Sequence, residues 1–212
     1  MEKEKSVIEK LKDFALKTHR KIDFSEKAYP SNALHPVSFH RRFVSIPDND
    51  YKRVFFACFE DSRKLDNYSV YSGVFFPIDV SNETKICVRK KHMFDKMSLF
   101  GKKQYYKTGV DSFDSQVVFD EFTAIGTNKI FTNDKIQNLI LKVFDFDARL
   151  RVGINMLNLD FMPELKGRSY IGIYTSQNWF TNSSEIEILY DLTEQLQKQS
   201  VFMREPDLVA QF

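Results

Sequence analysis

The stretch that decides the fold begins Phe113-Asp114-Ser115-Gln116-Val117-Val118-Phe119-Asp120-Glu121-Phe122 and ends at Trp179. Its opening is apolar and rich in residues that favour strands, and it reaches a turn at Gly126-Thr127-Asn128. A helix follows, and two or three alternating segments, residues 152–156 and 157–161 among them, then lead through Gly167 to a last strand at residues 170–174. We therefore expect a strand, a helix and a short meander that bury a common apolar face.

The helix of this stretch has clear periodicity. Thr132 or Asn133 is suited to cap its first turn, and Asp134 favours the positive end of the helix dipole. The apolar residues then recur at helical spacing, at Ile136, Leu139, Ile140, Val143 and Phe144. This pattern predicts one helix packed on the sheet.

Amphipathic helices are expected at both ends of the chain, over residues 3–18 and from residues 182–184 to about 202. The first has an apolar face and a polar face of mixed charge, which favours packing on the same protein or on a second copy over binding to lipid. The second begins with two capping-box spacings, Asn182 to Glu185 and Ser184 to Glu187. Both helices are therefore expected to contribute to a core or to an interface.

The section between these parts is predicted to be rich in strands. Residues 54–59 form a continuous apolar run, which is typical of a strand covered on both faces. Segments 68–71 and 74–76, joined at Gly73, and the half-exposed segment 85–89 are further strands. Residues 22–47 are interrupted by prolines and are expected to be a connector with one short strand at 39–46. We interpret His35, His40, Arg41 and Arg42 within it as part of a solvated loop.

Composition indicates an ordinary globular protein. The 212 residues are 42% hydrophobic and 28% charged, and 21 phenylalanines suggest a core rich in aromatic rings. The net charge of +2 does not point to a nucleic-acid protein. Cys58 and Cys87 lie in apolar, strand-like surroundings and are expected to be buried free thiols. With no signal peptide and no apolar run of membrane-spanning length, the expected location is the cytoplasm.

The most unusual charge distribution is that of residues 85–107. The segment contains eight basic residues and one acidic residue, Asp95, so its net charge is +7. Aromatic residues are interleaved with the basic ones. The favoured interpretation is a solvated loop whose aromatic side chains pack on the core and hold the loop in place. The alternative is a binding site for nucleic acid or an anionic lipid surface, because bases neutralise phosphates and aromatic rings stack on nucleobases. The candidate binding residues are Arg89, Lys90, Lys91, Lys102, Lys103, Tyr105 and Tyr106.

No motif nominates a catalytic site. The chain has no glycine-rich phosphate loop, no Gly-x-Ser-x-Gly elbow and no His-Glu-x-x-His pattern. The histidines and cysteines lack the spacing of metal ligands. We therefore expect no catalytic residues, no metal and no cofactor, and we favour a protein that is not an enzyme. An enzyme whose site is assembled only in three dimensions stays open as a third class.

The apolar spacing of one part of the chain resembles a known family. It is carried by Gly73-Val74-Phe75-Phe76-Pro77-Ile78-Asp79, Thr84-Lys85-Ile86-Cys87-Val88, Phe113-Asp114, residues 119–126, the helix at 133–144 and the strand at 170–174. This part, about residues 73–180, resembles an uncharacterised bacterial family known as a domain of unknown function, whose members often lie beside membrane segments. The resemblance implies a shared fold and supplies no site residues. This chain departs from many members because it lacks a membrane segment.

Together these patterns predict an α+β fold, a single domain with a mixed, mainly antiparallel sheet, one packed helix and amphipathic helices at both ends. The expected organisation is an N-terminal helix and connector at 1–47, the α+β domain at 48–203 and a loose tail at 204–212. The leading function is a cytoplasmic, non-enzymatic interaction or scaffold protein that self-associates. The alternative is a binder of nucleic acid or anionic lipid through residues 85–107, and membrane association through a partner stays open.

Overall fold

A computed structural model describes residues 6–33, 36–48, 53–63, 69–96, 106–123 and 130–200. The α+β fold class is confirmed, because these residues contain four α-helices and eight strands, and the strand pairs described below are antiparallel. No helix in these ranges is long and apolar enough to cross a membrane. The chain divides into two compact units, which are Met1–Phe76 with Tyr174–Thr193 and Pro77–Ile173 with Glu194–Phe212.

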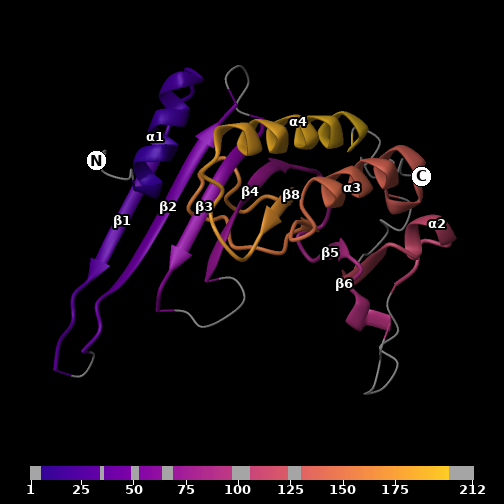
Figure 1. The fold of residues 1–212 in the computed structure, drawn as a ribbon, viewed down its shortest axis with the longest axis horizontal. Coiled ribbons are helices and arrows are strands. Elements are labelled where there is room, and N and C mark those ends of the chain that lie inside the picture. Colours follow the sequence, from indigo (N-terminus) through magenta and orange to yellow (C-terminus); the bar gives the residue numbers. More distant parts are fainter. Residues whose placement is uncertain are drawn as a thin grey trace, which may run out of the picture. The chain divides into compact units, whose positions relative to one another are not determined.

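The first unit is built on four strands in the order β1-β2-β3-β4 (Figure 1). They are β1 (Asp23–Tyr29), β2 (Phe39–Pro47), β3 (Phe55–Asp61) and β4 (Val70–Pro77), with the helices α1 (Val7–Lys17) and the first part of α4 (Ser183–Ser200). Six of the seven residues of β3 are buried, which confirms the prediction of a strand covered on both faces.

Helix α1 packs on the body of its own unit. It begins with a capping box in which the Ser6 hydroxyl accepts from the Glu9 N–H and the Glu9 carboxylate accepts from the Ser6 N–H. Just beyond the helix, the Arg20 guanidinium lies over the Tyr190 ring of α4 at 4.4 Å and forms an ion pair with Glu187. Burial alone would lower the pKa of Arg20, but the hydrogen bond to Glu187 and the surrounding negative charges together raise it.

The Tyr190 hydroxyl connects α4 to the strand ladder. It donates to the Ile46 carbonyl at 2.5 Å and accepts from the Phe56 N–H at 3.3 Å. Ile46 and Phe56 are directly opposite each other in β2 and β3, so a single hydroxyl bridges a cross-strand pair. Burial raises the pKa of Tyr190, and the hydroxyl remains a neutral donor and acceptor at physiological pH.

The second unit contains the order β7-β5-β6 and the helix α3. Its elements are β5 (Lys85–Lys90), a 3-10 turn at Met93–Lys96, α2 (Asp111–Asp114), β6 (Val117–Thr123), a 3-10 turn at Ile130–Thr132, α3 (Asp134–Phe146), β7 (Arg151–Ile154) and most of β8 (Tyr170–Thr175). The Asn133 side chain caps α3 by accepting from Lys135 and Ile136, as its place in the sequence predicts.

The strand predicted to open at Phe113 begins later, at Val117. Residues before it form the short helix α2, because the Asp114 carboxylate accepts from the Thr108 N–H, the Thr108 hydroxyl and the Gly109 N–H. Such local bonds from an aspartate to the backbone compete with strand pairing. The turn predicted at residues 126–128 lies outside the described residues.

Two predictions for the first unit are wrong. The connector contains a whole strand, β1, which pairs along its length with β2. Its only large apolar side chains are Phe24 and Tyr29, so its sequence carries little strand signal. The segments separated at Gly73 are one strand, because Gly73 lies within the ladder opposite Ala57 and does not form a turn.

The alternation predicted to make a strand at residues 157–161 belongs to a turn region. Leu157 and Leu159 are buried there. The Tyr170 hydroxyl holds the segment by donating to the Leu157 carbonyl at 2.5 Å and accepting from its N–H. The apolar pattern therefore reflects a buried loop and not a strand paired with a neighbour. The Tyr170 hydroxyl supplies hydrogen bonds to the Leu157 main chain that strand pairing would otherwise supply.

The compact units differ from the predicted domain boundaries. The first unit joins residues on both sides of position 47, because β2 pairs with β3 across it. Helix α4 is described to Ser200, and the predicted tail at 204–212 lies outside the described residues.

Removal of the Tyr190 hydroxyl tests how α4 is attached. Tyr190→Phe leaves the Ile46 carbonyl and the Phe56 N–H without their shared partner in a buried place, so we expect the free energy of unfolding to fall by about 1–3 kcal/mol. The control is Tyr29→Phe, because the Tyr29 ring lies over surface cations and we expect a change within about 0.5 kcal/mol. Urea denaturation measures both. Equal effects of the two variants would contradict this role for Tyr190.

Candidate functional site

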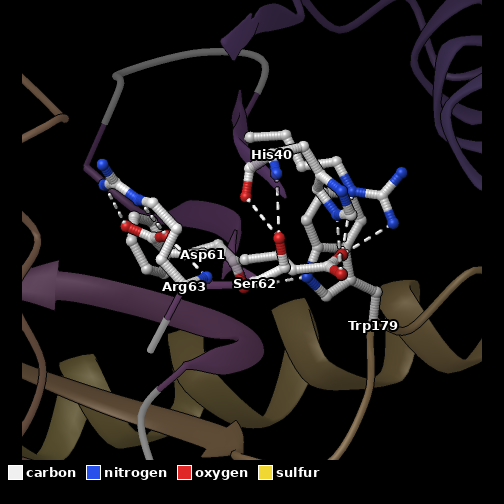
Figure 2. A network of polar contacts seen from close by, with 8 residues as sticks. His40, Asp61, Ser62, Arg63 and Trp179 are labelled. Atoms are coloured by element: carbon white, nitrogen blue, oxygen red, sulfur yellow. Dashed lines mark hydrogen bonds and ion pairs between the residues drawn. The ribbon is translucent and has the colours of Figure 1, made fainter. Parts of the chain in front are cut away.

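A polar cluster lies across β2 and β3 in the first unit (Figure 2). The Glu60 carboxylate accepts from Arg42 Nε at 2.8 Å and Nη2 at 2.6 Å, and its other oxygen lies 2.9 Å from His40 Nε2. Arg42 and Glu60 are directly opposite in the ladder. Burial alone would raise the pKa of Glu60, but the hydrogen bonds from Arg42 and His40 outweigh burial and hold the pKa below its usual range.

Trp179 closes one side of this cluster. Its ring lies 4.8 Å from the Arg42 guanidinium carbon, and its indole N–H donates to the Phe59 carbonyl at 3.0 Å. The guanidinium is therefore held between a carboxylate and an aromatic face. Figure 2 shows His40 and Trp179 on the same side of the network, with Asp61 and Arg63 on the other.

A second ion pair follows directly on β3. Both oxygens of Asp61 accept from the Arg63 guanidinium, at 2.9 and 2.7 Å, and this holds the pKa of Asp61 below its usual range. The Arg63 guanidinium also lies 4.0 Å from the Tyr29 ring of β1. The contact between the Arg63 guanidinium and the Tyr29 ring therefore connects the end of β3 to the outermost strand.

The geometry of these groups is that of a structural connection. The Ser62 hydroxyl bonds to the main chain of His40, at 2.8 Å from its N–H and 3.1 Å from its carbonyl, and not to the imidazole. The imidazole is directed to Glu60. No nucleophile and base are paired here, and the charges neutralise one another within the cluster.

The interpretation of His40 and Arg42 as loop residues is wrong, since both lie on β2. Their acid partner is Glu60, which lies twenty residues after His40 and eighteen after Arg42. No local spacing could show that partner, because the pairing register of β2 and β3 brings it into place. Of the other two residues of that group, Arg41 lies over the Phe59 ring at 5.3 Å, and His35 is outside the described residues.

In the predicted basic segment, Arg89 forms a cluster with two carboxylates, those of Asp95 and Asp120. Arg89 donates to both oxygens of Asp95 at 2.7 Å and to Asp120 at 2.8 Å, and its side chain is only 15% exposed. These hydrogen bonds raise the pKa of Arg89 against the opposite effect of burial and lower that of Asp95 to about 2. The guanidinium is therefore engaged inside the protein.

The remaining candidates of that segment do not converge in the described structure. Lys90 forms an ion pair with Asp145 at 3.2 Å, and Lys91 is half-buried. Tyr106 is stacked on Phe122, with ring centroids 3.5 Å apart, so this face of its ring is covered. Lys102, Lys103 and Tyr105 lie outside the described residues. Anion binding by residues 85–107 stays a prediction.

A polar hollow of about 360 Å³ lies beside the turn at Asn155 in the second unit. The Asn155 amide donates to the carbonyls of Ser81 and Thr84 and to the Ser169 hydroxyl, and its oxygen accepts from the Tyr170 N–H. Asn155 has a φ of 51°, which asparagine tolerates better than most residues. The side chain is occupied in closing this turn.

In the part of the chain that the structure describes, no three or more His, Cys, Asp or Glu side chains gather so as to hold a metal ion. Both cysteines are buried free thiols, as predicted.

Comparison with known proteins returned no match, whether to a protein-family model, to a curated protein or to a solved structure. The resemblance of residues 73–180 to a bacterial family of unknown function therefore stays a prediction.

The Arg89–Asp95 pair predicts acid sensitivity. The pKa of Asp95 falls from an ordinary value of 3.8 to about 2, so its contribution to stability is complete above pH 4 and is lost as the pH falls through 2. We expect Asp95→Asn to lower the free energy of unfolding by about 1–2 kcal/mol at pH 7, because solvent screens part of the interaction. The gap to the parent protein then narrows towards pH 2.

Denaturation at several pH values measures this gap. Asp145→Asn is the control, because that carboxylate is 76% exposed and its pair with Lys90 is expected to contribute at most about 0.5 kcal/mol. A gap for Asp95→Asn that does not change with pH would show that the carboxylate is not stabilised by Arg89.

Proposed function

We propose that this chain is a non-enzymatic interaction protein that self-associates by pairing strand β1 with β1 of a second copy. The observation that carries the proposal is the open edge of the first unit. Strand β1 is first in the strand order and pairs with β2 on one side. A strand at the edge of a sheet presents unpaired N–H and C=O groups, which are a template for another strand.

The side chains of β1 are accessible to a second strand. Asp23 and residues 25–28 are exposed, and Phe24 and Tyr29 are partly exposed. Proteins commonly protect such an edge with charged residues, and lysine in particular blocks unwanted pairing. Charges prevent pairing only when the opposite strand repeats the same sign, so the register decides the outcome.

Symmetry limits the registers that two identical strands can adopt. A two-fold axis that pairs them antiparallel lies along the sheet normal, and it leaves each side chain on its own face of the sheet. Opposite residues share a face of the sheet, and faces alternate along a strand. The axis must therefore pass midway between the two copies of one residue, which lie opposite each other.

Only one central residue gives favourable charges. An axis at Glu26 or at Lys27 would oppose two like charges. An axis at Ser25 places Asp23 opposite Lys27 of the second copy, and symmetry repeats this pair. Each cross-strand pair of opposite charges is expected to contribute about 0.2–1 kcal/mol. The sequence of β1 is therefore self-complementary about Ser25.

Other features support the remaining parts of the proposal. The site geometry supports a non-enzymatic role, since the His40 imidazole bonds to Glu60 and the Ser62 hydroxyl bonds to main-chain atoms. Two buried free thiols, Cys58 and Cys87, suit a reducing compartment and favour the cytoplasm. Burial raises the pKa of Cys58 well above its ordinary value, which keeps the thiol protonated and unreactive.

A charge swap tests the register. K27D opposes two acids across the axis, so we expect the dimer dissociation constant to rise about tenfold or more. D23K opposes two bases and should have the same effect. The double variant D23K/K27D restores opposite charges and should recover most of the lost affinity. Analytical ultracentrifugation over a range of concentrations measures all four proteins. A parent protein that stays monomeric, or a double variant as weak as the single ones, would refute the proposal.

Cross-linking locates the two-fold axis. S25C brings two thiols directly opposite each other, so we expect a disulfide-linked dimer under mild oxidation. E26C is the control, because its two thiols would be offset by about 7 Å along the strands, beyond the reach of a disulfide. Non-reducing electrophoresis measures the linked fraction. Equal linkage of both variants would indicate random collision, and linkage of E26C alone would move the axis.

A further inference from the structure

A groove in the second unit lies between α3 and the last turns of α4. Its volume is about 310 Å³, and both of its walls belong to the same compact unit. Its polar lining consists of Lys135, Asn138 and Lys142 from α3 and Gln195, Lys198 and Gln199 from α4.

Helical spacing explains why these side chains face one another. Lys135, Asn138 and Lys142 follow at intervals of three and four residues and therefore share one face of α3. On α4, Lys198 and Gln199 lie three and four residues after Gln195 and therefore share its face of the helix. The buried Leu139 completes the lining and gives the groove an apolar part.

The described lining of the groove is positively charged. It contains three lysines and none of the carboxylates that the structure describes. In the described part of the chain these three lysines form no ion pair, whereas Arg42, Arg63, Arg89 and Lys90 each have a carboxylate partner. Like charges that converge on one hollow repel each other, and an anion in the hollow would relieve that repulsion.

Lys135 adds to this indication through its position. It lies in the first turn of α3, which begins at Asp134, and the first turn is the positive end of the helix dipole. A lysine is unfavourable there for the helix itself. A local choice that opposes the stability of its own element is typical of a functional position. The ammonium group adds to the positive charge of the groove, while the main-chain N–H groups of Lys135 and Ile136 donate to the Asn133 side chain.

We propose that this groove binds a diphosphate-bearing ligand. Three ammonium groups match several negative charges, and the amide N–H groups of Asn138 and Gln199 can donate to phosphate oxygens. The volume equals that of about ten water molecules, which is more than a single phosphate ion fills. The ligand is a free small molecule or the phosphorylated headgroup of a lipid, since both present the same chemistry. The proposal does not depend on pairing through β1.

Titration calorimetry with inorganic pyrophosphate tests the groove. We expect the parent protein to bind, and the variant K135Q/K142Q/K198Q to lose at least tenfold in affinity. The matched control is K17Q/K21Q/K166Q, which removes the same charge from exposed positions elsewhere and should stay within twofold of the parent. Circular dichroism and thermal melting confirm that both variants are folded.

The source of the ligand is tested with phosphatidylcholine vesicles that contain phosphatidylinositol bisphosphate. Vesicle binding that pyrophosphate displaces, and that the groove variant loses, identifies a lipid headgroup. Pyrophosphate binding without vesicle binding identifies a free ligand. The proposal is overturned if the parent protein does not bind pyrophosphate at millimolar concentration, if the groove variant binds like the parent, or if the control loses as much as the groove variant.

Discussion

The first unit depends on the antiparallel register of β2 against β3. This register sets Arg42 opposite Glu60 and Ile46 opposite Phe56. A shift by one residue would turn each of these side chains to the other face of the sheet. The Tyr190 hydroxyl bridges the second pair, and Trp179 covers Arg42 of the first, so α4 and the segment before it can pack only on this register. One pairing therefore positions the core, the polar cluster and the helix together.

The same register leaves β1 at the edge. Among the described strands, β1 is first in the order and pairs with β2 alone, because β2 has β3 on its other side. The cation of Arg63 reaches across to the Tyr29 ring and helps to hold this outermost strand in place. An edge strand that is already ordered loses less conformational entropy on association than a frayed strand does. An ordered β1 with self-complementary charges is therefore better suited to pairing with an identical strand.

Charge in this protein has two different roles, and sequence alone does not separate them. Residues 85–107 form the most basic run of the chain, yet Arg89 neutralises Asp95 and Asp120, and Lys90 is paired with Asp145. The lysines of the α3–α4 groove are scattered in the sequence at positions 135, 142 and 198. They converge only when the two helices pack, and none of the described acidic residues lines the groove. Proximity to a carboxylate, and not the density of basic residues, distinguishes a structural cation from an accessible one.

The sequence by itself determined the elements whose signals are local. The spacing of Ile136 to Phe144 and the Asn133 cap predict α3, and the apolar run at residues 54–59 predicts β3, because periodicity and caps act within a few residues. Tertiary structure decided what depends on distant partners. Strand β1 forms on the template of β2, and Glu60 reaches His40 and Arg42 through the ladder. These contacts join residues whose separation along the chain carries no periodic signal, so only the folded backbone could bring them together.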